Sequence, residues 1–135
     1  MVRMTAFTTA NSELELELPS EPASVSKARS ALAEVARRLG AREEDVKLAV
    51  SEAVSNAVVH AFGEGSGTIT LRAWRERDRL DVLVADDGDG MTPKVERAGL
   101  GLGISVITRL AAEVRFDSSE QGTAVHMSFP TAGAG

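Results

Sequence analysis

The chain has 135 residues, a formal net charge of -5 and no cysteine. This length fits one domain with its own core, and the lack of cysteine excludes disulfides and thiolate metal sites. Nucleic-acid binding normally needs a basic surface, and no apolar run approaches the ~20 residues of a membrane span or forms a signal-peptide core. We therefore expect one cytoplasmic domain over residues 1–135, without nucleic acid or membrane as partner, and with residues 1–11 and 131–135 disordered.

The first half of the chain predicts one strand and then two helices. Glu and Leu alternate strictly over residues 13–18, which predicts a strand with one buried face near a sheet edge. Apolar residues recur at three- and four-residue steps over residues 25–39, which predicts a helix that Gly40 ends. A second helix is expected over residues 43–60, where a polar stripe with Glu52 and Asn56 lies beside the core stripe. That core stripe consists of Val46, Val50, Ala53, Val54, Ala57 and Val58.

The middle of the chain predicts a hairpin. Residues 63–67 are rich in glycine, but no Lys-Ser or Lys-Thr pair follows them. They are therefore interpreted as a connection and not as a Walker-type phosphate loop. Strands are expected over residues 68–74 and 80–85, around a charged turn. Because the arginines from Arg72 to Arg79 alternate with acidic residues, they are interpreted as a solvated strand edge and turn.

The last part predicts a third helix and a second hairpin. Residues 101–112 show helical spacing of apolar residues, and strands are expected over residues 113–118 and 123–129. Together these elements predict an α+β two-layer sandwich, with the helices on one face of a mixed, mainly antiparallel sheet.

Glu52 and Asn56 are the first candidates for chemistry. They lie one helical turn apart among Ala and Val residues, where an unpartnered carboxylate and amide would be costly. Simple exposure of both is the alternative. A neutral amide oxygen suits Mg²⁺, which takes few protein ligands besides phosphates and waters. A carboxylate one turn away could accept a proton as a general base.

Two glycine-bearing segments follow this helix. Asp86 ends a buried strand ahead of Gly88 and Gly90, so its carboxylate could accept a hydrogen bond from an exocyclic amine while the glycines admit a flat base. An ordinary turn is the alternative. The second segment, residues 99–103, opens a helix whose free N–H groups and dipole suit phosphate, although it does not match a Rossmann fingerprint. The order of these motifs predicts a site for a nucleotide with magnesium.

In this order the motifs resemble those of the GHKL superfamily, which includes DNA gyrase, MutL-type repair proteins and histidine-kinase catalytic domains. Residues 52–56 are similar to its N box, and the two glycine segments are similar to its glycine boxes. Gly122-Thr123 resembles the Gly-Thr pair ahead of its last strand. The resemblance covers residues 12–130, and the helix over residues 50–60 is most similar to that of small bacterial anti-sigma factor serine kinases.

The resemblance implies a kinase that uses ATP and Mg²⁺, phosphorylates a serine of an anti-anti-sigma factor and sequesters a sigma factor. We expect the chain to form a homodimer. It implies Glu52 as general base, Asn56 as magnesium ligand and nucleotide contact, and Asp86 as the reader of adenine, supported by Thr123. Arg29 is implied at the partner surface, with an ordinary exposed helix arginine as the alternative. The further nucleotide contacts that it implies are Gly88, Gly90, Met91, Gly99, Leu100, Gly101, Leu102 and Gly103.

Two other functions stay open at this point. One is a non-catalytic protein that binds nucleotide only to set its affinity for a partner. The segment over residues 91–98, shorter than the usual lid of the family, favours that alternative, whereas the presence of both Glu52 and Asn56 favours a kinase. The other is an isolated histidine-kinase catalytic domain, although the added strand and helix over residues 13–39 suit the anti-sigma type better.

Overall fold

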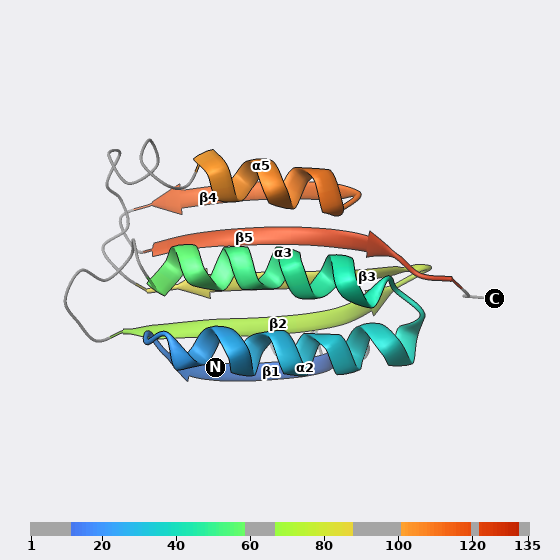
Figure 1. Cartoon of the computed structure of the whole chain (residues 1–135), viewed down its shortest axis with the longest axis horizontal. Coiled ribbons are helices and arrows are strands. Elements are labelled where there is room, and N and C mark those ends of the chain that lie inside the picture. The colour runs from blue at the N-terminus through green and yellow to red at the C-terminus, as the bar shows by residue number, and fades with distance from the viewer. Residues whose placement is uncertain (1–11, 59–66, 88–100, 120–121, 133–135) are drawn as a thin grey trace.

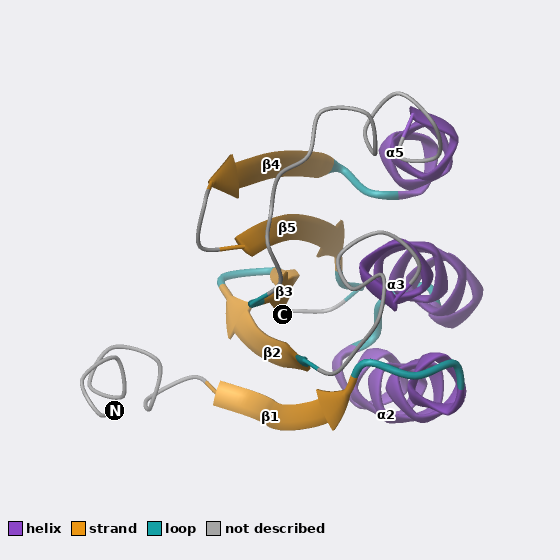
Figure 2. Ribbon diagram, turned by 90° about the vertical axis from the view of Figure 1, so that its left-hand side faces the viewer, coloured by secondary structure: helices purple, strands orange, loops and turns teal. Residues whose placement is uncertain are grey.

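The structure is a computed structural model that describes residues 12–58, 67–87, 101–119 and 122–132. In that part of the chain the elements are β1 (Ser12–Pro19), α2 (Ala23–Leu39), α3 (Glu43–Asn56), β2 (Thr68–Glu76), β3 (Arg79–Asp86), α5 (Gly101–Leu110), β4 (Glu113–Ser119) and β5 (Gly122–Pro130). The three helices lie side by side on one face of the sheet (Figure 1, Figure 2). The predicted α+β two-layer sandwich is confirmed.

The five strands form one sheet in the order β1-β2-β3-β5-β4. β1 lies at one edge, as the Glu-Leu alternation predicts, and β4 lies at the other. All four pairings between these strands are antiparallel, so the described sheet is antiparallel and not mixed. β3 is the central strand, so its residues lie in the middle of both faces of the sheet.

The core lies between the helices and the sheet. Period-two alternation sends one set of strand residues toward the helices, and the apolar stripes of α2 and α3 cover them. The largest fully buried side chains are Leu32, Val35, Val46, Val50, Val54, Ile69, Leu71, Leu80, Val82, Ile107, Met127 and Phe129. The predicted stripe of α3 is confirmed, except that Val58 is only partly buried against the core. None of the described helices is long and apolar enough to span a membrane.

Several element ends differ from the prediction for local reasons. Gly40 ends α2 in the left-handed conformation with φ of 83°, as predicted. α3 is regular only to Asn56, because the backbone widens into a π-type turn at Ala57 and Val58; His60 lies outside the described residues. α5 ends at Leu110 because the N–H of Ala112 donates to the carbonyl of Ser128, 2.7 Å away, and so starts the next strand pairing.

Two other expectations need correction. β2, which carries Arg72 and Arg75, is not a sheet edge, because β1 pairs along its outer side. The C-terminal segment was expected to be disordered from residue 131, but the N–H of Thr131 donates to Asp78 O and that of Ala132 to Gly40 O. These bonds hold the first two residues of that segment against the turn regions of the fold; residues 133–135 and 1–11 lie outside the described residues.

Candidate functional site

The described elements that carry Glu52, Asn56, Asp86 and Thr123 meet at one end of the sandwich. Antiparallel pairing brings the carboxyl end of β3 beside the start of β5, with Asp86 directly opposite Thr123. The end of α3 and the first turn of α5 lie at this same end, at the left of Figure 1. Residues separated by some 70 positions in the sequence are therefore brought to a common place by the topology alone.

Asp86 points to the helix side of the sheet. It continues the alternation of Leu80, Val82 and Val84, which are buried against the helices. Its register partner Thr123 belongs to the corresponding series of β5, so both side chains share this face. Asp86 is half-buried at the end of the apolar layer between the sheet and the helices. Its carboxylate can therefore accept a hydrogen bond from a donor while it keeps part of its hydration.

Asp87, which was not predicted to matter, closes the sheet just beyond Asp86. Its carboxylate Oδ1 accepts a hydrogen bond from the N–H of Thr68 at 3.0 Å. Its own N–H donates to the carbonyl of Thr68 at 3.3 Å. The chain leaving β3 is therefore fastened to β2 immediately after Asp86. An aspartate ahead of a glycine often forms such side-chain-to-backbone hydrogen bonds, so this sequence pattern could have predicted the role of Asp87.

Gly122 determines how close β5 can come to Asp86. Its φ is +141°, and a Cβ built on it would lie 2.0 Å from the carbonyl oxygen of Asp86. Any side chain at this position would therefore force the start of β5 away from the end of β3. The resemblance drew attention to Gly122, but no structural role for it was predicted.

Gly122→Ala is expected to lower the free energy of unfolding by ~1–3 kcal/mol, the usual cost of a strained backbone conformation. Nucleotide affinity should fall with it, because Asp86 and Thr123 would separate. Chemical denaturation and calorimetry with ADP measure the two effects. A variant with unchanged stability would show that this close approach is not a constraint on the fold.

Glu52 and Asn56 share a face of α3 near the end of that helix. Both are half-buried, so the alternative in which both are simply exposed is wrong. Ser51 next to them directs its hydroxyl to the carbonyl of Lys47 at 2.7 Å, which occupies that hydroxyl within the helix. The carboxylate of Glu52 and the amide of Asn56 are thus polar groups that the last turns of α3 can offer to the site.

The first turn of α5 is the remaining described part. Gly101, Leu102 and Gly103 are its first residues, so its backbone presents the free N–H groups expected for phosphate binding. Gly88, Gly90, Met91, Gly99 and Leu100 lie outside the described residues, as does the segment over residues 91–98. The contacts predicted for them stay predictions.

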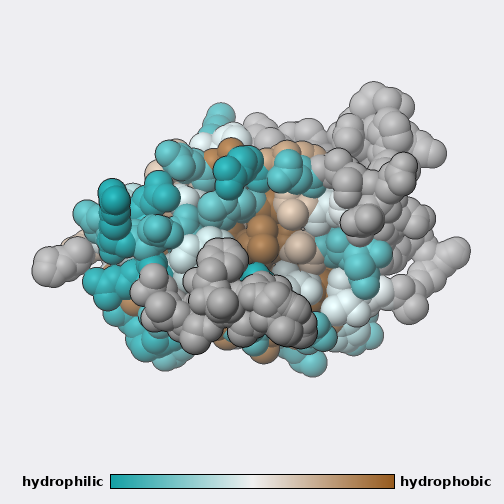
Figure 3. Space-filling model, turned by 180° about the vertical axis from the view of Figure 1, so that it is seen from behind, coloured by the Kyte–Doolittle hydropathy of each residue, from teal (hydrophilic) through white to brown (hydrophobic). Residues whose placement is uncertain are grey.

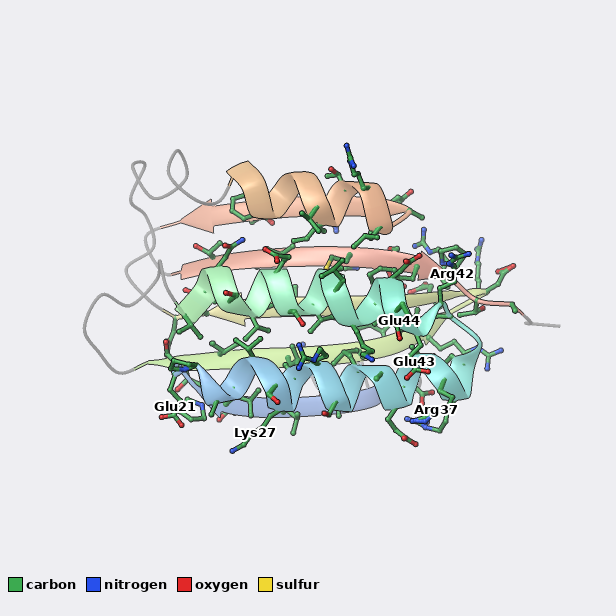
Figure 4. All side chains as sticks on the ribbon, in the orientation of Figure 1. Glu21, Lys27, Arg37, Arg42, Glu43 and Glu44 are labelled. Atoms are coloured by element: carbon green, nitrogen blue, oxygen red, sulfur yellow. The ribbon has the colours of Figure 1, made fainter. Side chains whose placement is uncertain are left out.

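Arg29 belongs to α2, not to the elements that carry Glu52, Asn56, Asp86 and Thr123. It is an exposed residue of α2, on the outer surface of the helix layer. Other charged residues of the helices, Arg37, Arg42, Glu43 and Glu44, gather where α2 passes into α3, at the end opposite to Asp86 (Figure 4). No hydrogen bond or ion pair among the described residues links Arg29 to the candidate site, and its role at a partner surface stays a prediction.

Comparison with known proteins identifies the family of this chain. The model of the family described as "Histidine kinase-like ATPase domain" matches residues 18–129. The anti-sigma F factor of Caldanaerobacter subterraneus is 32% identical over 133 residues, covering 87% of this chain and 93% of that protein. The serine-protein kinase RsbW of Bacillus subtilis is 40% identical over 92 residues, covering 65% of this chain and 58% of that protein.

Solved structures show the same fold. The RsbU and RsbW domains of a Mycobacterium tuberculosis protein match with a TM-score of 0.66, 21% identity, and coverage of 91% of this chain and 35% of that one. The histidine kinase domain of a blue-light activated kinase from Erythrobacter litoralis matches with a TM-score of 0.56 and 26% identity, over 85% of this chain and 62% of that one. The match spans about three fifths of the length of the RsbW relatives.

Proposed function

This chain belongs to the histidine kinase-like ATPase family, and we propose that it is an ATP-dependent serine kinase acting as an anti-sigma factor. In this proposal it binds ATP with Mg²⁺, phosphorylates a serine of an anti-anti-sigma factor and sequesters a sigma factor. We place it in the cytoplasm as a homodimer.

One observation carries the proposal: Asp86 with Thr123 and the half-buried pair Glu52 and Asn56 gather at the end where α5 begins. A carboxylate for an exocyclic amine, an amide oxygen for a hard cation and a helix start for phosphate are the groups that a nucleotide with Mg²⁺ requires. The names of the RsbW and anti-sigma F relatives support the choice of a serine kinase with a sigma factor as partner.

The residues present fit ATP and Mg²⁺. Asn56 offers one neutral oxygen, and Mg²⁺ commonly takes one or two protein ligands and completes its shell with phosphate oxygens and waters. Gly101 and Gly103 have no side chains, so phosphate oxygens can approach the first N–H groups of α5 closely. When bound, the metal would neutralise charge on the phosphates.

Each side chain then has a separate task. Asp86 accepts a hydrogen bond from the adenine amine, and Thr123 on the next strand holds that carboxylate in place. Asn56 would hold the metal. Glu52 would take the hydroxyl proton of the target serine. The serine oxygen would form a bond to the γ-phosphorus of ATP as the bond from that phosphorus to the bridging oxygen breaks, which would release ADP. Arg29 on the exposed side of α2 contacts the protein partner.

A non-catalytic nucleotide-binding regulator is the second candidate, favoured by the short segment over residues 91–98. It would use Asp86 and Asn56 in the same way but would need no proton acceptor. Phosphate transfer to the partner therefore separates the two candidates, whereas nucleotide binding does not.

Asn56→Ala is expected to abolish most of the effect of Mg²⁺ on ATP affinity while ADP still binds without metal. The amide oxygen contacts the metal, and the base and ribose are held elsewhere. Calorimetry with ATP and ADP, at several magnesium concentrations, measures this. Leu48→Ala on the same stripe of α3, two turns earlier and exposed, is the matched control. A wild-type magnesium response in Asn56→Ala would remove Asn56 from the metal site.

A further inference from the structure

Asp87 directly follows Asp86 and holds the end of the sheet through its side chain. Its N–H donates to the carbonyl of Thr68 at 3.3 Å, as in a hydrogen-bonded pair of antiparallel strands. In such a pair the second bond would run from the N–H of Thr68 to the backbone carbonyl of Asp87. The N–H of Thr68 donates instead to the carboxylate Oδ1 of Asp87, at 3.0 Å. The side chain therefore takes the place of the backbone acceptor where the pairing of β2 with β3 ends.

This exchange fixes the residue at which the chain continues beyond the sheet. The two hydrogen bonds join Asp87 and Thr68 in one closed ring, so the position of Asp87 relative to β2 is set. Aspartate side chains commonly bind backbone groups in this way where regular pairing stops. Gly88, the first residue of the nearer glycine segment, comes next in the sequence. The carboxylate of Asp87 thus anchors the point from which that segment begins.

The start of β2, to which Asp87 is bonded, is held by β1 as well. Thr68 lies opposite Pro19 in the register of β1 and β2. The carbonyl of Gly67, the residue before Thr68, accepts a hydrogen bond from the N–H of Ser20 at 3.1 Å. The bond from Thr68 to Asp87 therefore ties the end of β3 to a strand start that the neighbouring strand already holds.

The peptide between Asp86 and Asp87 is confined from the β5 side too. A Cβ built on Gly122 would lie 3.2 Å from the Cα of Asp87, besides its closer approach to the carbonyl oxygen of Asp86. Asp86 itself lies between Ile69 of β2 and Thr123 of β5 in the strand registers. Neighbouring strands thus hold this peptide from both sides, and on the β2 side the carboxylate of Asp87 makes the last bond.

Asp86 and Asp87 belong to opposite faces of the sheet. Side chains alternate along a strand, and Asp86 continues the series of β3 that faces the helices. Asp87 belongs to the other series, on the face that Figure 3 shows and that none of the described helices covers. The groups of α3 and α5 that suit a metal ion and phosphate lie on the helix side. The influence of Asp87 on a nucleotide held there would therefore run through the backbone of Asp86.

We propose that Asp87 is a positioning residue for nucleotide binding: its hydrogen bond to the N–H of Thr68 sets the backbone from which the carboxylate of Asp86 reaches the adenine amine. The inference rests on the proposed function, in which Asp86 reads the base. Such a hydrogen bond needs a donor–acceptor distance of about 3 Å and good alignment, so a displaced strand end weakens it. A strand end that is already held in place also needs no ordering when the ligand binds.

Two substitutions separate the hydrogen bond of Asp87 from its charge. Asp87→Ala removes both, whereas Asp87→Asn removes the charge and keeps an amide oxygen that can accept from Thr68. Because Asp87 is exposed, water can solvate the freed N–H, and both variants should fold. We expect Asp87→Ala to weaken ADP binding about three- to tenfold and Asp87→Asn to stay within about twofold of wild type. If Asp87 acted by repelling the phosphates, both variants would bind ADP more tightly, which would overturn the proposal.

A double-mutant cycle with Asp86→Asn shows whether Asp87 acts through its neighbour. In the Asp86→Asn background, Asp87→Ala should cost little further ADP affinity, because the contact that it disturbs is already lost. Fully additive losses would assign Asp87 an effect independent of Asp86 and overturn the positioning role. Asp117→Ala is the matched control: Asp117 is an exposed carboxylate at the same end of the sheet, opposite Ala124, and its removal should leave ADP affinity unchanged.

Calorimetry with ADP measures the affinities, and circular dichroism verifies that each variant is folded. Amide hydrogen exchange at Thr68 is the independent readout: its N–H should exchange faster in Asp87→Ala and at the wild-type rate in Asp87→Asn. Equal ADP affinity of Asp87→Ala and wild type overturns the positioning role, and so does a loss that Asp87→Asn shares in full. A wild type that binds no ADP would overturn the proposed function itself, and this inference with it.

Discussion

Glu52→Gln is expected to slow phosphate transfer to the partner serine by ~10²–10⁴-fold, the usual loss when a general base is removed. The amide keeps the shape and hydrogen bonding of the carboxylate but cannot take the hydroxyl proton. ATP affinity and partner binding should change little, since neither depends on a base. Rapid-mixing assays with labelled ATP, beside calorimetry on the same samples, measure the two properties separately.

Glu44→Gln is the matched control for this experiment. Glu44 belongs to the same helix, pairs with Lys47 at 3.4 Å, and lies at the end of α3 far from Asp86 (Figure 4). The Glu44→Gln variant should transfer phosphate at the wild-type rate. Equal rates for Glu52→Gln and wild type would exclude Glu52 as the base, while a parallel loss of ATP affinity would assign it to binding instead.

Asp86→Asn is expected to weaken ADP and ATP binding by ~10- to 100-fold. A hydrogen bond from the adenine amine to a charged acceptor contributes ~1.5–3 kcal/mol, and an amide in its place can present a donor to a donor. GTP and other nucleotides without that amine should be affected less. Calorimetry on the folded variant measures the loss.

Asp78→Asn serves as control for Asp86→Asn. Asp78 is an exposed residue of the tight turn before β3, at the other end of that strand. Its substitution should leave nucleotide affinity unchanged. If the two variants bind ADP alike, the carboxylate of Asp86 does not read the base, and its place opposite Thr123 serves the sheet alone.

The fold was predictable wherever a local pattern carried the information. The alternation of Glu and Leu in β1 reflects an edge strand with one covered face, and Gly40 supplies the left-handed residue that ends α2. Strand order was not predictable in this way, because pairing of β2 with β1 depends on residues distant in sequence. The prediction of a solvated strand edge and turn for the arginines is therefore wrong for β2, which lies inside the sheet, although Arg75 and Arg77 near the turn are exposed.

In the candidate site, too, local features were predictable and contacts between distant residues were not. The helical spacing of Glu52 and Asn56 suffices to predict that they share one face of α3. The position of Asp86 directly after a buried apolar run suffices to predict that it ends a strand. The approach of Gly122 to the carbonyl of Asp86 arises only when β5 returns beside β3. Burial of Asp81 was equally inaccessible, since its partners His126 and Ser128 lie more than 40 residues away in the sequence.

Phosphate transfer by the wild-type protein tests the central claim most directly. The chain would be mixed with Mg²⁺, labelled ATP and the anti-anti-sigma partner co-purified from the native host, and the partner analysed for phosphoserine. Stoichiometric phosphoserine on that partner, dependent on this chain, is the result expected of a serine kinase. Tight nucleotide binding without any phosphoserine on a partner that binds the chain would contradict it and establish the non-catalytic regulator instead.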